Sequence, residues 1–244
     1  RKRSTLGGAL VMTAPGVPMI FQGQEFLEDE YFRDSIALDW SKKETYQGVF
    51  ELHRDLIALR RSLNGNSRGL TGPNTNFFHV NNNDKLVGFH RFQDGGPGDD
   101  VVVVMNFRDQ PWNNYRIGFP RSGEWKVIFN SDSTNYGEDY GNHPGNDITT
   151  EATPYDGLGQ SAEIGIGPYT CLIFSQVGNP PPPPPPPPGP PEDLNGDGVV
   201  GLFDVLIVLS NWGASDVGDV NGDGAVEFND LVAILAAWLS LIHI

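Results

Sequence analysis

The sequence predicts a multidomain chain with a helix–strand–helix segment, an all-β sandwich, a polyproline linker and a small α-helical calcium-binding module. An unbroken run of prolines at residues 180–188 separates the chain into two parts. Before this run, from residue 76 onward, short apolar or alternating stretches are bounded by Gly, Pro, Asn and Asp, which is typical of a β-sandwich. After it, a short acidic, glycine-containing stretch occurs twice, and an apolar segment follows each copy.

The chain begins with a helix–strand–helix pattern. STLGGALVMT, residues 4–13, predicts a helix with Ser4 or Thr5 near its N-cap. VPMIF, residues 17–21, predicts a short buried strand, and residues 46–63 predict a second helix. The apolar face of that helix contains Val49, Leu52, Leu56, Leu59 and Leu63. Because a buried parallel strand needs neighbours on both edges and both faces, we expect this segment to be the end of a larger unit.

The strands of the sandwich are expected to be runs of four to nine residues, within stretches that include residues 85–91, 99–107, 115–132 and 167–176. VVVVM, within the second stretch, is expected to be a central strand that is covered on both faces. Residues 131–160 are polar and rich in Asn, Gly and Tyr, so they are expected to be a long excursion rather than strands.

Aromatic and histidine side chains offer few functional candidates. Core packing is the favoured interpretation of the tryptophans in the first part, and stacking on sugars is the alternative. These tryptophans are Trp40, Trp112 and Trp125. His53 and His90 stand in helix and strand patterns without partner ligands, so we expect both to be ordinary packing or surface residues.

The proline run predicts an extended linker over residues 179–191. A proline-only segment forms neither helix nor sheet and adopts polyproline II, which is semi-rigid. Such a segment is also a ligand for proline-reading domains. Its position between an apolar strand and an acidic repeat favours the spacer, which divides the chain near residue 180.

The acidic repeat consists of DLNGDGVVGLFD at residues 193–204 and DVNGDGAVEFND at residues 219–230. A single copy is also compatible with a surface turn, because Asn-Gly and Asp-Gly favour turns. The apolar segments VLIVLSNW and LVAILAAW follow the two copies. Since a turn has no reason to repeat together with its flanking helix, the duplication favours a metal loop.

Oxygen ligands at alternating positions of a tight loop are the pattern that binds Ca²⁺. The side chains and carbonyls expected in the first site are Asp193, Asn195, Asp197, the Val199 carbonyl and Asp204. Those expected in the second site are Asp219, Asn221, Asp223, the Ala225 carbonyl and Asp230. Glu227 is expected to bind directly or through water, whereas Gly201 leaves the same position of the first loop to water. The sequence therefore predicts two calcium sites over residues 192–238.

Charge and composition exclude several classes of function. The net charge is −15, and every Lys and Arg lies at or before Lys126. Nucleic acid and anionic membranes are therefore not expected partners. No apolar run is long enough to span a membrane, and the single Cys171 excludes an intrachain disulfide. The final stretch LSLIHI, residues 239–244, is expected to be a non-native tail.

The loops end in Asp204 and Asp230 where calcium-sensor loops usually end in Glu. With the duplicated loop and helix, residues 192–238 resemble the dockerin family, a set of secreted modules that bind cohesin-type scaffold domains. The resemblance implies a possible cohesin partner and an extracellular location. The connection between the copies is shorter than in that family. Leu202-Phe203 and Phe228-Asn229 stand where the family often has Ser or Thr for cohesin contact.

A second resemblance covers residues 1–177. APGVPMIFQGQEF, LDW and DLIALRRS, followed by KLVGFHR, DDVVVVMNF, YRIGFPRSGEWKVIFNSD and GPYTCLIFSQ, resemble the end of α-amylase superfamily enzymes. Among them, the 1,4-α-glucan branching enzymes are most similar. The resemblance implies the last strand and helices of a (β/α)₈ catalytic barrel at residues 1–64. It also implies an all-β C-terminal domain at residues 65–178.

This resemblance implies that the catalytic residues lie outside the chain. The family's carboxylates project from the ends of barrel strands four, five and seven, which would precede Arg1, so no catalytic residue is expected here. Gln24 and Glu25 follow the expected last barrel strand. They are candidates for substrate contact, and a structural hydrogen-bonding role is the alternative.

The sequence thus predicts the C-terminal fragment of a secreted enzyme that acts on α-glucan polysaccharide and is attached through a calcium-binding, dockerin-like module. Branching transfer and amylase-like hydrolysis both remain open. The alternative is a non-catalytic carbohydrate-binding or scaffold-attachment protein.

Overall fold

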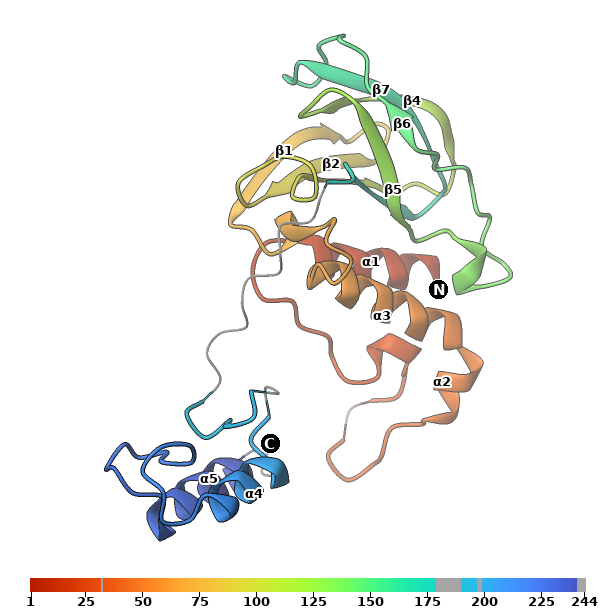
Figure 1. The fold of residues 1–244 in the computed structure, drawn as a ribbon. Coiled ribbons are helices and arrows are strands. Elements are labelled where there is room, and N and C mark those ends of the chain that lie inside the picture. Colours follow the sequence, from red (N-terminus) through yellow and green to blue (C-terminus); the bar gives the residue numbers. More distant parts are fainter. Residues whose placement is uncertain (32, 179–189, 197–198, 241–244) are drawn as a thin grey trace. The chain divides into compact units, whose positions relative to one another are not determined.

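A computed structural model describes residues 1–31, 33–178, 190–196 and 199–240, and for residues 239 and 240 it describes the backbone alone (Figure 1). The chain divides into two compact units, Arg1–Pro181 and Pro182–Ile244. Most of the expected linker at residues 179–191 lies outside the described residues, as does the end of the expected non-native tail.

The first unit begins with two helices that pack side by side, α1 (Lys2–Thr13) and α3 (Gln47–Arg60). Short helices lie between them and after them: η1 (Gln24–Phe26), α2 (Ser41–Thr45) and η2 (Arg68–Leu70). The expected N-cap at Ser4 or Thr5 is wrong, because α1 already begins at Lys2. The second helix is shorter than expected: it ends at Arg60, and Leu63 beyond it is 60% exposed.

The buried strand expected at residues 17–21 is not present. These residues form no strand, and Val17 and Met19 are 96% and 78% exposed. The described residues supply no neighbouring strand to pair with this segment, and an isolated strand cannot satisfy its backbone groups.

The rest of the first unit is an antiparallel β-sandwich. Its larger sheet has the order β1-β2-β3-β8-β5-β6, and a smaller sheet pairs β4 with β7. The strands of the larger sheet are β1 (Asn74–Asn81), β2 (Leu86–Phe92), β3 (Val101–Asn106), β5 (Glu124–Asn130), β6 (Ile148–Thr149) and β8 (Thr170–Ser175). The smaller sheet contains β4 (Trp112–Phe119) and β7 (Gln160–Ile166).

Strand β3 lies at the centre of this unit, as expected. It pairs with β2 on one edge and β8 on the other, and all its residues are buried. Val101, Val103 and Met105 pack in the core that α1 and α3 share, whereas Val102 and Val104 pack in the core shared with β4 and β7. Side chains alternate between the two faces of a strand. The unit therefore has three layers, namely helices, larger sheet and smaller sheet (Figure 1).

Residues 115–132, one of the stretches expected to contain strands, form two strands in different sheets. A turn at residues 120–123 separates β4 from β5, and Gly123 adopts a positive φ of 113° in this turn. Strand β7 was not predicted from the sequence. Residues 131–160, expected to be an excursion rather than strands, contain the 3-10 turn η3 (Thr134–Tyr136) but also the short strand β6 (Ile148–Thr149), so the expectation holds only in part.

The second unit is a pair of helices, α4 (Leu202–Ser210) and α5 (Phe228–Ser240), each preceded by one acidic loop. Its core is small and contains Val200, Val205, Val208, Val226 and Ile234. Among the described residues of the whole chain, no helix is long and apolar enough to cross a membrane.

Candidate functional site

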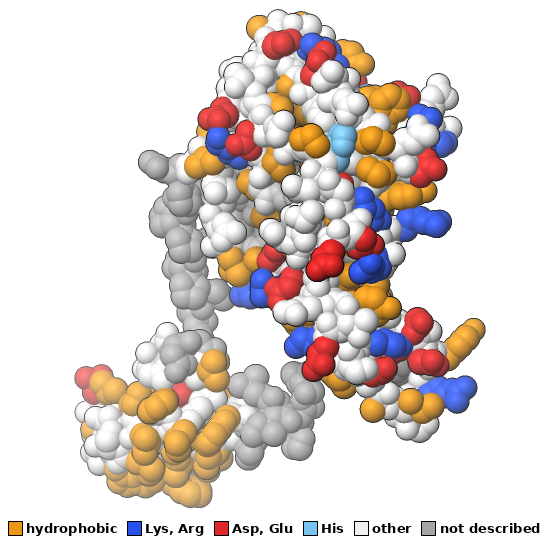
Figure 2. Space-filling view, turned by 90° about the vertical axis from the view of Figure 1, so that its right-hand side faces the viewer, with side chains coloured by type: hydrophobic (Ala, Val, Ile, Leu, Met, Phe, Trp, Pro, Cys, Tyr) orange, Lys and Arg blue, Asp and Glu red, His pale blue; other side chains and the backbone are white. Residues whose placement is uncertain are grey.

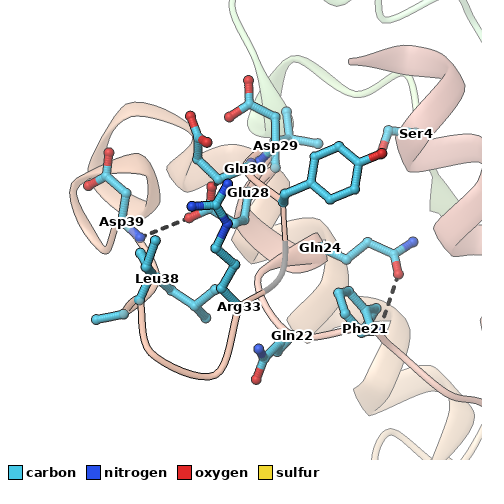
Figure 3. Close-up of a pocket in the computed structure, with 14 residues that line it drawn as sticks. Ser4, Phe21, Gln22, Gln24, Glu28, Asp29, Glu30, Arg33, Leu38 and Asp39 are labelled. Carbon is cyan, nitrogen blue, oxygen red and sulfur yellow. Dashed lines mark hydrogen bonds between the residues drawn. The ribbon is translucent and has the colours of Figure 1, made fainter.

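Gln24 lines a cavity of about 540 Å³ that is formed chiefly by the loop between α1 and α2. Its side-chain Oε1 accepts a hydrogen bond from the backbone N–H of Phe21 at 3.3 Å. Figure 3 shows Gln24 and Phe21 on one side of this cavity and the acidic residues Glu28, Asp29 and Glu30 on the other. The amide of Gln24 therefore belongs to the wall of a mainly apolar cavity that also carries amide and carboxylate side chains, and its substrate contact stays a prediction.

Glu25 lies in a different cavity, of about 360 Å³, whose wall is mostly apolar and includes Ile20, Phe50 and Ile57. Its Oε2 atom is buried without a hydrogen-bond partner among the described residues, and so is Nε2 of His53 in the same wall. His53 is buried in α3 and its Nδ1 lies 2.9 Å from the Val49 carbonyl, which confirms the expected packing role. The structure thus separates Gln24 from Glu25 instead of bringing them together.

Lys42 forms ion pairs with two carboxylates in the wall of the Gln24 cavity. Lys42 Nζ lies 2.6 Å from Glu28 Oε1 and also contacts Asp29. The hydrogen bond from Lys42, together with backbone N–H groups of Glu30 and Asp39, lowers the pKa of Glu28 to about 2. The same two carboxylates raise the pKa of Lys42. Because both carboxylates are ion-paired, this wall suits hydrogen bonding to a ligand better than proton transfer.

The tryptophans differ in burial. Trp125 is fully buried, as expected, and Trp112 packs partly buried against the same core. Trp40 is 61% exposed, so its expected core position is wrong. Its ring centroid lies 5.1 Å from that of Phe26, at the end of the loop that lines the Gln24 cavity. In the sequence, the position of Trp40 directly after Asp39, in a polar loop, is the feature that indicates an exposed side chain.

In the second acidic loop, the side chains at the expected ligand positions bind the loop's own backbone. Asp219 accepts from the N–H groups of Gly222 at 2.8 Å, Asp223 at 3.1 Å and Gly224 at 2.8 Å. Asn221 Oδ1 accepts from Asp223 N–H, and Asp223 Oδ1 from the N–H of Ala225. The loop is therefore wrapped around its acidic side chains.

Asp230 and Asp204, at the last loop positions, are fully buried. Asp230 accepts from the N–H groups of Val220, Asn221 and Glu227 at 2.8–3.1 Å, and these bonds, led by Glu227, lower its pKa. Asp204 accepts from the equivalent groups of the first loop, those of Leu194, Asn195 and Gly201, at 2.8–3.1 Å. Each aspartate therefore closes its loop onto the start of the following helix.

The remaining expected ligands are only partly described. Asp193 Oδ1 accepts from Gly196 N–H at 3.0 Å, and Glu227 Oε1 accepts from the Asn229 amide at 2.8 Å. Asp197 lies outside the described residues. The carboxylate and amide oxygens fit Ca²⁺ by donor type, and each keeps lone pairs beyond those used by the N–H groups. Among the described residues, no group of three or more His, Cys, Asp or Glu side chains is assembled for a metal, so calcium stays a prediction for both loops.

Comparison with known proteins finds a family match within the first unit. Residues 78–177 match the family described as alpha amylase, C-terminal all-beta domain. This match covers the sandwich from β1 to the end of β8. Over these residues the chain is therefore similar to the C-terminal all-beta domain of alpha amylases.

The relatives include particular enzymes. The chain is 32% identical over 177 residues to the 1,4-alpha-glucan branching enzyme GlgB of Rhodospirillum rubrum, which covers 68% of this chain and 23% of that enzyme. For the enzyme of the same name from Nitrosococcus oceani, identity is 32% over 170 residues, covering 64% and 21%. Among solved structures, pullulanase type I from Bacillus subtilis str. 168 has 17% identity and a TM-score of 0.48, covering 72% of this chain and 23% of that one. The chain spans less than a quarter of the length of these relatives.

Proposed function

We propose that this chain is the C-terminal part of an enzyme that acts on α-1,4-glucan. The observation that carries the proposal is the similarity, over about two thirds of this chain, to enzymes named as 1,4-alpha-glucan branching enzymes. Within the described residues, the cavity beside Gln24 has a mainly apolar wall whose amide and carboxylate groups suit sugar hydroxyls. The catalytic carboxylates belong, in this proposal, to a part of the protein that precedes Arg1.

The proposed reaction is glycosyl transfer of the branching type or hydrolysis of the amylase type. Both cleave the same α-1,4 bond, and they differ in whether a sugar hydroxyl or water accepts the glucosyl group. Incubation of the complete protein with amylose separates the two. Branching shifts the iodine colour without releasing reducing ends, whereas hydrolysis releases them. A complete protein that does neither would contradict the proposal.

A non-catalytic carbohydrate-binding or scaffold-attachment protein is the second candidate. It is favoured by the ion pairs of Lys42, which leave the carboxylates Glu28 and Asp29 as binding groups rather than acids. The sequence before Arg1 decides between the two. If that sequence lacks the three barrel carboxylates of the superfamily, the non-catalytic candidate is supported and the proposal of an enzyme is contradicted.

For the second unit we propose an attachment module that binds two Ca²⁺ and docks onto a cohesin-type scaffold outside the cell. Calcium of the required concentration is found outside cells, which supports export. Figure 2 shows apolar side chains gathered on this unit. Matching positions of its two helices are exposed, with Leu206 and Leu209 in α4 and Val232 and Leu235 in α5. Exposed apolar patches mark interaction surfaces.

The attachment proposal has its own test. The 244-residue chain is passed over immobilised cohesin domains of several types, with calcium and with a chelator. Calcium-dependent retention of the chain on one type of cohesin domain supports the proposal that the second unit is an attachment module. Absence of retention on every type would contradict the cohesin partner while leaving the glucan proposal to the amylose assay.

A further inference from the structure

A third cavity, of about 380 Å³, opens at one end of the sandwich. Its side chains come from β1, β2, the loop after β2, the first residues before β3 and the turn after β4. They include Asn76, His90, Phe92, Asp94, Asp100 and Arg121. All of them lie within the all-β part of the chain, and none lines the Gln24 cavity. Its volume falls within the range of about 300–1,000 Å³ that is usual for small-molecule sites.

The floor of this cavity is a rigid charged cluster. Asp100, whose side chain is 1% exposed, accepts from His90 Nε2 at 2.8 Å, Arg121 Nε at 2.5 Å and Gly96 N–H at 2.9 Å. Burial raises the pKa of Asp100, but the hydrogen bonds from His90, Gly96 and Arg121 lower it by more, so it is below its ordinary value. The carboxylate is therefore held as an anion that fixes the imidazole and the guanidinium.

Two stacked rings, those of His90 and Phe92, lie next to this charged cluster in the cavity wall. The rings of His90 and Phe92 stack with their centroids 4.5 Å apart and their planes 19° apart. The two residues alternate with Arg91 along β2 and so face the same side of the sheet. Asn76 pairs with His90 across β1 and β2, which places its amide beside the stacked rings. Because Asp100 holds the His90 ring, the Phe92 ring that stacks on it is held as well.

Hydrogen-bonding groups of both kinds surround the rings. The side chain of Asp94 is 67% exposed and that of Arg121 is 49% exposed, and Asn76 is also exposed. Carboxylate, guanidinium and amide thus stand around an aromatic face. A sugar ring presents an apolar C–H face with hydroxyl donors and acceptors at its edge, which matches this arrangement. An anionic ligand does not match it, because Asp94 and Asp100 are both in the wall.

We infer that this cavity is a glucan-binding subsite in which a glucose ring stacks on Phe92 while Asp94, Asn76 and Arg121 bind its hydroxyls. The inference rests on the proposed function for its ligand class. It gives the all-β part of the chain a substrate-holding role of its own, in which α-glucan is kept on the protein between catalytic events. No bond is made or broken at this site.

The test measures binding of maltoheptaose to the 244-residue chain by calorimetry, with cellohexaose as the β-linked comparison. Phe92→Leu keeps an apolar side chain but removes the ring face, and its control is Phe77→Leu, an aromatic that is 57% exposed on the other face of the larger sheet. Asp94→Ala removes the carboxylate of the rim. Its control is Asp109→Ala, because Asp109 is also an exposed carboxylate and does not line the cavity. Circular dichroism melts establish that all four variants are folded.

The expected result is that the unaltered chain binds maltoheptaose, that Phe92→Leu and Asp94→Ala each weaken binding by about tenfold, and that both controls bind as the unaltered chain does. If the controls weaken binding equally, or if no variant changes it, the subsite is overturned although the chain binds glucan. Absence of maltoheptaose binding overturns the subsite as well, and the amylose assay on the complete protein then judges the proposed function separately. Preference for cellohexaose overturns the assignment to α-glucan.

Discussion

The guanidinium of Arg91 donates a hydrogen bond to the backbone carbonyl of Thr13 at 2.7 Å, which joins the sandwich to the end of helix α1. Arg91 is 1% exposed and also donates to the carbonyls of Leu70 and Gly72. Burial lowers its pKa, and nearby Arg60 lowers it further. The final carbonyls of a helix lack partners within the helix and carry partial negative charge. A buried cation is therefore stabilised here by carbonyl dipoles.

Replacement of this arginine tests how strongly the two layers are joined. Arg91→Leu leaves three buried carbonyls without these donors, so the free energy of unfolding should fall by about 3 kcal/mol. Urea denaturation measures the loss. Arg54→Leu, at a side chain that is 64% exposed, is the control and should change it by less than about 0.5 kcal/mol. Equal midpoints for the two variants would show that Arg91 does not join the layers.

The carboxyl of Glu28 should titrate far below an ordinary glutamate. Its pKa falls from 4.5 to about 2 because Lys42 and two backbone N–H groups bind the ionised form. A lowered folded-state pKa means that ionised Glu28 stabilises the fold above about pH 4.5 and that this contribution is lost as the pH falls towards 2. Carboxyl NMR titration measures the pKa directly. In thermal melts, the difference between the unaltered chain and Glu28→Gln should shrink through this window.

The neighbouring residue provides the control for this titration. Glu30→Gln removes an exposed carboxyl two positions away that makes no ion pair with Lys42. It should leave the Glu28 titration near pH 2. A Glu28 carboxyl that titrates near 4.5 in the unaltered chain would refute the ion pair in solution.

Calcium should bind to the acidic loops with a stoichiometry of two. Addition of Ca²⁺ should increase helical circular dichroism and a chelator should reverse it, because metal binding couples to folding. Calorimetry should find one site lost in Asp197→Ala and the other lost in Asp223→Ala. Asp216→Ala, an exposed acid between the loops, is the control and should keep both sites. Circular dichroism that is unchanged by calcium and by chelator would rule out the metal assignment.

Without calcium, Asp230 should contribute more than Asp223 to the stability of the second unit. Asp230 binds three backbone N–H groups from a fully buried position, so Asp230→Ala should destabilise the second unit by about 1–3 kcal/mol with or without calcium. Asp223→Ala should act chiefly when calcium is present. Amide hydrogen exchange at Val220, Asn221 and Glu227 measures the difference in chelator. Equal protection in the two variants would contradict a calcium-independent role for Asp230.

Local patterns identified elements whose pairing and packing partners lie within the same unit. The apolar run at residues 101–105 identified the buried central strand β3, and the periodicity of Val49, Leu52, Leu56 and Leu59 identified the buried face of α3. The strand expected at residues 17–21 failed because strand formation depends on a neighbour that no local pattern supplies. The placement of β4 and β5, both within residues 115–132, in different sheets depends on pairing with β7 and β8, which lie farther along the chain.

The candidate functional sites were also predicted only in part. The acidic repeat identified the loop positions from spacing alone, although their metal remains to be tested. The cavity beside Phe92 could not be predicted, because it depends on the pairing of Asn76 with His90 and on the ion pair of Arg121 with Asp100. The separation of Gln24 and Glu25 into two cavities was likewise hidden, since adjacent residues give no information on which way their side chains turn.

The small core of the second unit has a consequence for how its two loops respond to an ion. Val200 and Val226 occupy the same place in the two acidic loops, and both are buried in that one core. Val226 also exchanges backbone hydrogen bonds with Gly213 and Ala214, just beyond α4, at 2.8 and 2.7 Å. Ordering of one loop therefore orders part of the other. We expect cooperative ion binding, with a coupling free energy of about 1–3 kcal/mol, so that the unit responds to calcium as a single switch.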